Sequence, residues 1–170
     1  LDVSLVTNGS GLTDARADLL FRTNLKWARV SIDAGDREMH KRVHRTPDGH
    51  WQKAWAAVDR LVGRKSDDEQ KLGVGFVTTD QNYDGVYRCS MLAKEHGADN
   101  IRLSIAFTPQ MSRIVNENQL AVALEQGDHA KEDFNGPDFI VVHLIGERHQ
   151  NLVVGETTGQ DYPYCVTKDV

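Results

Sequence analysis

Five β-rich segments alternate with amphipathic, helix-like segments along this chain, and that alternation constrains its fold more than any other feature. The segment 72–79 (LGVGFVTT) is apolar on both faces, which is typical of a strand in a parallel sheet. Strands that alternate with helices imply right-handed crossovers, so we expect a parallel α/β fold. The other predicted strands are residues 3–7, 27–33, 101–107 and 139–146.

The segments between these strands carry helical periodicity. In WQKAWAAVDRLVGRK (51–65), Trp51, Trp55 and Val58 recur at helical spacing and form one apolar face. Each intervening helix is expected to pack that face against the sheet. The other helices are predicted from Thr13 or Asp14 to Phe21, over 83–96 with Gly97 as a C-cap, and over 111–127.

Composition excludes several classes of partner. The net charge of −5 gives no reason to expect a polyanion, so a nucleic-acid partner is not predicted. No apolar run approaches the roughly 20 residues that span a bilayer, and no basic-then-apolar leader is visible. The two cysteines, Cys89 and Cys165, are too few for a disulfide framework and suit a reducing compartment. We therefore expect a cytoplasmic protein without a membrane partner.

Polar side chains close several of the predicted strands. Asn8 follows the first strand, Ser31 and Asp33 end the second, and Asn82 follows the third. Ligands bind at the carboxyl ends of parallel strands, so these four side chains are candidates for one shared site. The alternative is that they form turns and helix caps, a role that we favour for Asn8 because Asn-Gly suits a tight turn.

Four segments in a fixed order resemble a known family. TNGSGL follows the first strand, RVSIDAGDREMHKRVHR surrounds the second, LGVGFVTTDQN holds the third, and LAKEHGADNIRLS leads into the fourth. Together they resemble the radical SAM (S-adenosylmethionine) superfamily, in its SPASM/twitch maturase-like branch, over about residues 3–107. The resemblance implies a fragment of a partial (βα)6 TIM-like barrel with outer helices. Residues 1–146 would be the C-terminal portion of that barrel, and 147–170 an auxiliary SPASM/twitch-like region or a tail.

The same resemblance implies a chemistry for the full-length parent. Members hold a [4Fe–4S] cluster on a CxxxCxxC loop, cleave S-adenosylmethionine reductively, and use the 5′-deoxyadenosyl radical to abstract hydrogen from a substrate. It also implies an electron donor such as a flavodoxin or ferredoxin, and here we favour a peptide or small-molecule substrate. No CxxxCxxC occurs in this sequence, and two distant cysteines cannot hold the cluster. We therefore expect a chain that begins at the third barrel strand and is inactive alone.

The resemblance assigns cofactor-binding roles to several strand-end residues. Ser31 and Asp33 match the family's polar pair at the end of the fourth barrel strand, which implies contacts to the ribose hydroxyls or the amine. Asn82 matches an asparagine near the nucleoside, with helix capping as an alternative role that can coexist. Val77 and Thr79 are candidates for the wall of the adenine pocket.

A basic segment after the second strand is the candidate for the carboxylate of the ligand. In the family an arginine follows a histidine here, and arginine meets a carboxylate bidentately. His40 matches that histidine, and Arg45 or Arg42 supplies the arginine, of which we favour Arg45. A strict alignment places His44 at the arginine position instead. The alternative for this segment is a solvated helix of mixed charge.

The remaining cysteines and histidines have two readings each. Cys165 matches the place of a first auxiliary-cluster ligand, or it is a lone cysteine, whereas Cys89 is predicted to be core. His143, Glu147 and His149 share one side of an extended segment, a spacing compatible with a metal site. We favour a barrel role for His143, lining the substrate cavity.

Two other functions are compatible with the residues. A (βα)-barrel lyase or aldolase would use Asp33, His40 or Lys94 for acid–base chemistry. A non-catalytic module would keep a nucleoside pocket without any reaction. A lysine at a strand end would favour the lyase or aldolase, and none is there, because Lys94 falls late in a predicted helix.

Overall fold

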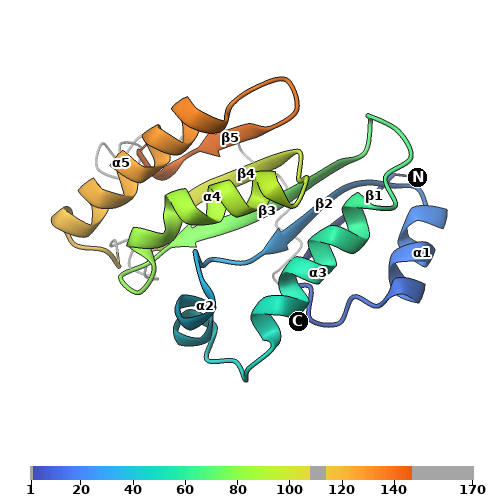
Figure 1. Ribbon diagram of the computed structural model, residues 1–170, viewed down its shortest axis with the longest axis horizontal. Helices are drawn as coiled ribbons and strands as arrows, with labels where there is room; N and C mark the ends of the chain where they lie inside the picture. The colour runs from blue at the N-terminus through green and yellow to red at the C-terminus, as the bar shows by residue number, and fades with distance from the viewer. Residues whose placement is uncertain (1, 108–113, 147–170) are drawn as a thin grey trace, which may run out of the picture.

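The computed structural model describes residues 2–107 and 114–146, and it contains one five-stranded sheet (Figure 1). All neighbouring strands pair in parallel in the order β1-β2-β3-β4-β5, so each strand lies beside its predecessor in the chain. The predicted parallel α/β fold is confirmed in this form, while closure into a barrel stays a prediction. The strands are β1 (Val3–Thr7), β2 (Leu25–Ser31), β3 (Lys71–Thr78), β4 (Asn100–Ile105) and β5 (Ile140–His143).

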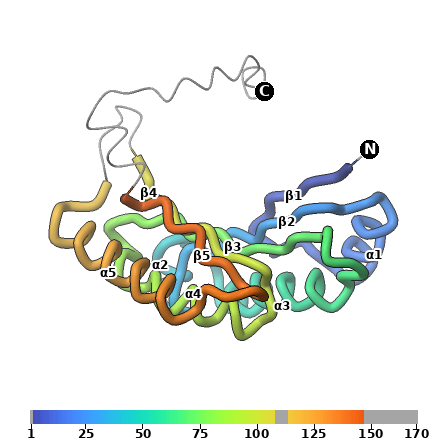
Figure 2. The backbone as a smooth tube through the Cα atoms, turned by 90° about the horizontal axis from the view of Figure 1, so that it is seen from above, coloured from blue at the N-terminus to red at the C-terminus, as the bar shows by residue number. Residues whose placement is uncertain are grey.

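The helices cover one face of this sheet. Figure 2 shows the strands as one layer and the helices as a second layer on one side of it. None of the helices is long and apolar enough to span a membrane, over the residues that the structure describes. The helices are α1 (Asp14–Arg22), α2 (Arg37–His44), α3 (His50–Val62), α4 (Val86–Glu95) and α5 (Glu117–Phe134), with a 3-10 turn, η1 (Tyr83–Gly85), before α4.

The core lies between the sheet and the helices. Alternate strand residues point to this layer because side chains alternate faces along a strand. Val74, Phe76, Ile101 and Leu103 of the two central strands are completely buried there. Burying a side chain of this size contributes on the order of 2 kcal/mol, so this layer holds the strands in place. Cys89 of α4 is also fully buried in it, which confirms the predicted core position.

The intervening strand positions form the opposite surface, which we call the open face. No described helix covers it. Because β3 contributes glycine at two of these positions, side chains from the neighbouring strands, Arg29 and Asn100, lie over its backbone there. The open-face positions used below are Trp27, Arg29 and Ser31 of β2, Lys71, Gly73, Gly75 and Val77 of β3, Asn100 and Arg102 of β4, and Ile140 and Val142 of β5.

Several predicted element boundaries were wrong. Strand β4 ends at Ile105 and not at residue 107, β5 ends at His143 and not at residue 146, and helix α5 continues to Phe134. Two other boundaries have an identifiable cause. Strand β2 ends at Ser31 because Asp33 has a left-handed backbone (φ +53°), which cannot continue a strand. Helix α5 begins at Glu117 and not near residue 111. Asn116 and Gln119 form a capping box, in which each side chain accepts a hydrogen bond from the other residue's backbone N–H, and this fixes the start of the helix.

One helix was expected only as an alternative, a solvated helix of mixed charge. The basic segment after β2 forms α2, whose N-cap Asp36 accepts a hydrogen bond from the Met39 N–H at 2.8 Å. Gly35 precedes it in a tight position, where an added Cβ would lie 2.9 Å from the Gly85 carbonyl oxygen. The segment therefore packs against the start of α4.

Candidate functional site

A small polar pocket lies at the carboxyl ends of β1 and β2. Its volume is about 150 Å³. Two of the predicted residues, Asn8 and Ser31, lie in its wall, together with histidines from α2 and the start of α3. We call it the strand-end pocket. Its lining residues are Asn8, Ser10, Ser31, His40, His44, Thr46 and His50.

Asn8 shapes the turn after β1 and also lines this pocket. Its Oδ1 accepts hydrogen bonds from the Ser10 N–H at 3.1 Å and the Ser10 hydroxyl at 2.9 Å. The next residue, Gly9, has φ +75°, and a Cβ there would lie 2.8 Å from the Ala57 Cβ. The turn therefore requires glycine. The Nδ2 amide group of Asn8 takes no part in the turn and can make other contacts.

Asp33 joins the end of β2 to β3. Its Oδ1 accepts a hydrogen bond from the Val77 N–H at 2.7 Å, and its Oδ2 lies 3.6 Å from His44 Nε2. Burial raises the pKa of the carboxyl group, opposed by the Val77 amide and by His44. One oxygen is thus structural, and the other faces a histidine of the strand-end pocket.

Asn82 is completely buried, and its carboxamide is fully occupied by the protein. Its Nδ2 donates to the Asp33 carbonyl at 2.8 Å and to the Val77 carbonyl at 3.0 Å. Its Oδ1 accepts from the Thr79 N–H at 2.6 Å and from the Thr79 hydroxyl at 3.0 Å. Asn82 makes no side-chain cap on the following turn, so the predicted capping role was wrong. It positions Asp33 and Thr79 and has no donor or acceptor left for a ligand.

Val77 and Thr79, the two residues predicted to form the adenine wall, differ in whether their side chains are accessible to a ligand. Val77 is 39% exposed on the open face, so its side chain is accessible to a ligand. The Thr79 hydroxyl donates to Asn82 and accepts from the Gln81 N–H at 3.2 Å. Thr79 therefore contributes to the loop conformation, and Val77 is the accessible member of the predicted adenine wall.

The histidines of α2 form the other wall of the strand-end pocket. The His40 side chain is buried, and its ring centroid lies 4.5 Å from that of His44 and 5.6 Å from that of Trp51. Burial, with His44 and His50 nearby, lowers the pKa of His40 to about 4, so its ring is neutral at pH 7. His44 Nε2 lies 2.9 Å from the Ile32 carbonyl oxygen, which orients that ring.

Neither of the two candidate arginines lines this pocket. Arg42 donates from Nε and one Nη to the Gln81 carbonyl, at 3.2 and 2.9 Å, and so anchors α2 to the loop after β3. Arg45 is exposed in the left-handed C-cap of α2 (φ +50°) and makes no ion pair with a described residue. His44, at the strictly aligned position, does line the pocket.

Of the predicted metal and cluster residues, the structure describes His143 alone. No group of three or more histidine, cysteine or acidic side chains in the described part of the chain is arranged to hold a metal ion. His143 faces α5 and not the cavity as predicted, since a Cβ at Gly127 would collide with its ring. Glu147, His149 and Cys165 lie outside the described residues.

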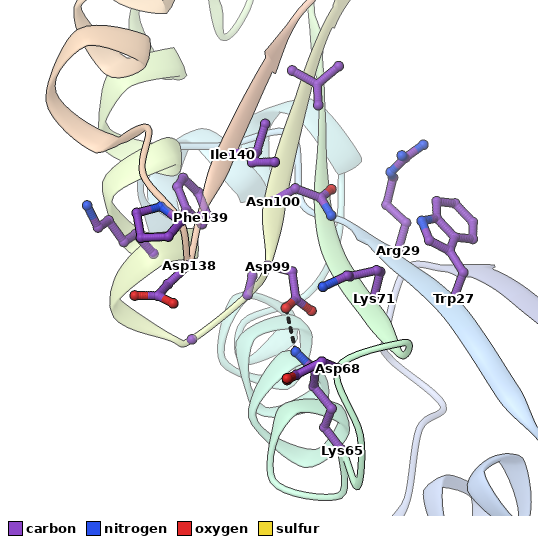
Figure 3. A pocket seen from close by; sticks show the side chains of 15 residues that line it. Trp27, Arg29, Lys65, Asp68, Lys71, Asp99, Asn100, Asp138, Phe139 and Ile140 are labelled. Carbon is purple, nitrogen blue, oxygen red and sulfur yellow. Dashed lines mark hydrogen bonds and ion pairs between the residues drawn. The ribbon is translucent and has the colours of Figure 1, made fainter.

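A larger cavity of about 960 Å³ occupies the open face toward the amino ends of β2 to β5 (Figure 3). Lys94 lines it and donates to the Phe134 carbonyl at 3.1 Å. Asp33 and His40 lie at the opposite ends of the strands. Lys94 therefore lies at the other edge of the sheet from Asp33 and His40, the two other acid–base candidates of the lyase or aldolase alternative.

Comparisons with known proteins give the fold alone. No family model matches the chain, and no curated protein matches it. Among solved structures, the crystal structure of Streptococcus suis SuiB is similar, with a TM-score of 0.58 and 11% identity. The match covers 82% of this chain and 32% of that one, so this chain spans about a third of its length. The similarity shows that this sheet and its helices have the fold of a part of that protein.

Replacing Asn82 by alanine is expected to destabilise the carboxyl edge strongly. Two carbonyls and one N–H would lose buried partners, which costs about 3 kcal/mol in the free energy of unfolding. Urea unfolding followed by circular dichroism measures this loss. The neighbouring variant Gln81→Ala, at an exposed side chain, should change stability by less than about 0.5 kcal/mol. Equal effects of the two variants would contradict the assigned role of Asn82.

Acidification is expected to destabilise the fold through His40. Its folded pKa of about 4 lies below its ordinary value, so between about pH 6.5 and 4 the unfolded chain binds a proton that the folded chain does not. Stability should fall by up to about 3 kcal/mol as pH drops through this window, and His40→Gln should remove that slope. The raised pKa of Asp33 acts in the opposite direction.

The measurement is urea unfolding at pH 7.5, 6, 5 and 4.5 for both proteins. His129→Gln, at an exposed position of α5, is the matched control and should keep the wild-type slope. A His40→Gln protein with an unchanged slope would show that His40 does not cause the acid sensitivity.

Proposed function

We propose that this chain is part of a radical SAM enzyme and that the strand-end pocket binds one end of S-adenosylmethionine. One observation carries the proposal. Residues that produce the family resemblance, from three separate segments, meet at the carboxyl edge of one parallel sheet, where ligands of such sheets bind. The pairing of Asn8 and Ser31 in one pocket is the part of this convergence that a ligand can reach.

The size of the pocket limits which part of the ligand it takes. About 150 Å³ is well below the ~300 Å³ at which pockets for whole drug-sized ligands begin. We therefore assign it to the ribose or to the methionyl end. The adenine would extend over the open face beside Val77, whose aliphatic side chain is accessible there.

Each polar group then has a role that its free atoms allow. The Ser31 hydroxyl and the Asn8 amide Nδ2 can donate hydrogen bonds to the ribose hydroxyls or to the carboxylate of the ligand. Asp33 does not line the pocket, and its second oxygen lies 3.6 Å from His44, so Asp33 helps to orient that ring while Asn82 holds the Asp33 backbone in position. His44 replaces Arg45 as the candidate partner of the carboxylate, because it lines the pocket and Arg45 does not.

The [4Fe–4S] cluster that the family uses does not fit this chain. Cys89 is completely buried, and burial raises the pKa of its thiol well above the ordinary range, the reverse of what a thiolate ligand needs. Cys165 is the one remaining thiol, and a cluster needs more than one. Reductive cleavage and hydrogen abstraction thus belong to the longer parent with its electron donor, and the substrate class stays open between peptide and small molecule.

Calorimetric titration with S-adenosylhomocysteine tests the nucleoside assignment. Wild type is expected to bind, and Ser31→Ala should bind about fivefold more weakly because it loses one hydrogen bond. Ser4→Ala, at an exposed position at the start of β1, is the matched control and should bind like wild type. To test the Asp33 carboxylate in the same titration, Asp33→Asn is a better variant than Asp33→Ala, because asparagine tolerates the left-handed backbone at this position. Absence of wild-type binding, or unchanged binding by Ser31→Ala, would contradict the assignment.

A second measurement tests the absence of cluster ligands. After anaerobic reconstitution with iron and sulfide, this chain is expected to hold no stoichiometric four-iron cluster, because it has two cysteines and one is buried in the core. Iron and acid-labile sulfide analysis gives the result. Four irons per chain would show that the cluster site lies within these residues.

A further inference from the structure

We propose that the cavity on the open face is a binding site for an organic carboxylate, with its acidic group on Arg29 and Lys71 and its apolar part on Trp27 and Ile140. All four residues line this cavity of about 960 Å³. Figure 3 shows Arg29, Trp27 and Lys71 grouped on one side of it, across from Ile140. This site lies toward the amino ends of the strands, so it is separate from the strand-end pocket and does not depend on S-adenosylmethionine binding.

Arg29 is the central cation of this site. Its Nε is buried and has no hydrogen-bond partner among the described residues. Its guanidinium lies over the Trp27 ring, 4.5 Å from the ring centroid. Partial burial and the like charge of Arg102 both lower the pKa of Arg29. A cation held in this way lacks the counter-charge that a bound carboxylate would provide.

Neighbouring cations at the same edge show the contrast. Lys65 pairs with Asp99 at 2.5 Å, and Lys26 pairs with Glu69 at 2.7 Å. Asp99 also accepts a hydrogen bond from the Leu72 N–H at 2.7 Å, which holds it at the amino end of β3. The nearby carboxylates of Asp99 and Glu69 are thus paired with Lys65 and Lys26, not with Arg29. Arg29, Lys71 and Arg102 make no ion pair within residues 2–107 and 114–146.

The central strand leaves room for the side chain of this cation. Gly73 and Gly75 of β3 pair with Arg29 and Ser31, and neither places a side chain on the open face. A Cβ at Gly75 would lie 3.1 Å from the Arg29 Cδ. Glycine in a central strand weakens it and marks a place where another group approaches the backbone. Here that group is the Arg29 side chain, which the glycine lets lie across the sheet.

The surroundings favour a singly charged organic acid over a phosphate. Asp68 and Asp138 line the same cavity, and their charges oppose a ligand that carries more than one negative charge. Ile140 is 53% exposed on one side of the cavity, and Trp27 is partly exposed on the other. An acid with an apolar portion gains contact with both, while its carboxylate reaches the guanidinium.

A ligand-observed NMR titration with 4-phenylbutyrate tests the site. The neutral 4-phenylbutanamide and the Arg29→Gln protein should each give about tenfold weaker binding, because both remove a charge-assisted contact. Arg22→Gln, at an exposed arginine of α1, is the matched control and should bind like wild type. Equal affinity for acid and amide, or full affinity in Arg29→Gln, would overturn the proposal.

A second variant, a phosphonate ligand and a competition experiment test the same proposal. Lys71→Gln changes an exposed side chain, so it decides the outcome if Arg29→Gln does not fold, and it should weaken binding about threefold. A 4-phenylbutylphosphonate that binds more tightly than the carboxylate would overturn the choice of carboxylate. S-adenosylhomocysteine should not displace phenylbutyrate, and displacement would show that the two sites are one.

Discussion

The buried carboxamide of Asn82 is the interaction on which the carboxyl edge of this sheet depends. Neighbouring parallel strands are joined by long crossovers, so their ends are not held together by a shared turn. Asn82 supplies the missing connection by bonding to the backbone of Asp33, 49 positions away in the chain, and to Val77. The left-handed backbone of Asp33 and the position of its carboxylate follow from this anchor.

The one-sided covering of the sheet then separates two chemistries. Residues that face the helices make a continuous apolar core, while the open face keeps arginine, lysine and two glycines. At the carboxyl edge the strand-end pocket offers hydrogen-bonding groups and a neutral His40. Toward the amino edge, the open-face cavity offers Arg29 and Lys71 beside Trp27, two cations without an ion-pair partner among the residues that the structure describes. The two ends of one sheet thus differ in the side chains that they present: histidine, serine and asparagine at the carboxyl edge, and arginine, lysine and tryptophan toward the amino edge.

Much of the architecture could be predicted because it depends on local patterns. The strands, the parallel order and the core position of Cys89 follow from apolar runs and their alternation with helical segments. Helix α2 was expected only as an alternative, a solvated helix of mixed charge, because its strongly charged sequence has few apolar positions and its start depends on the cap Asp36. The start of α5 was misplaced because the capping box of Asn116 and Gln119 was overlooked, although that signal is present in the sequence.

The candidate site was predictable in its membership but not in its geometry. The sequence by itself determined that polar groups close three successive strands, because the residue types and their places after apolar runs are local facts. Only the tertiary structure decided that Asn82 is consumed by the protein, that Arg45 lies outside the pocket and that Lys94 lies at the far edge. The physical reason is that a side chain's direction after a strand depends on backbone dihedrals and on partners from distant segments, which no local pattern encodes.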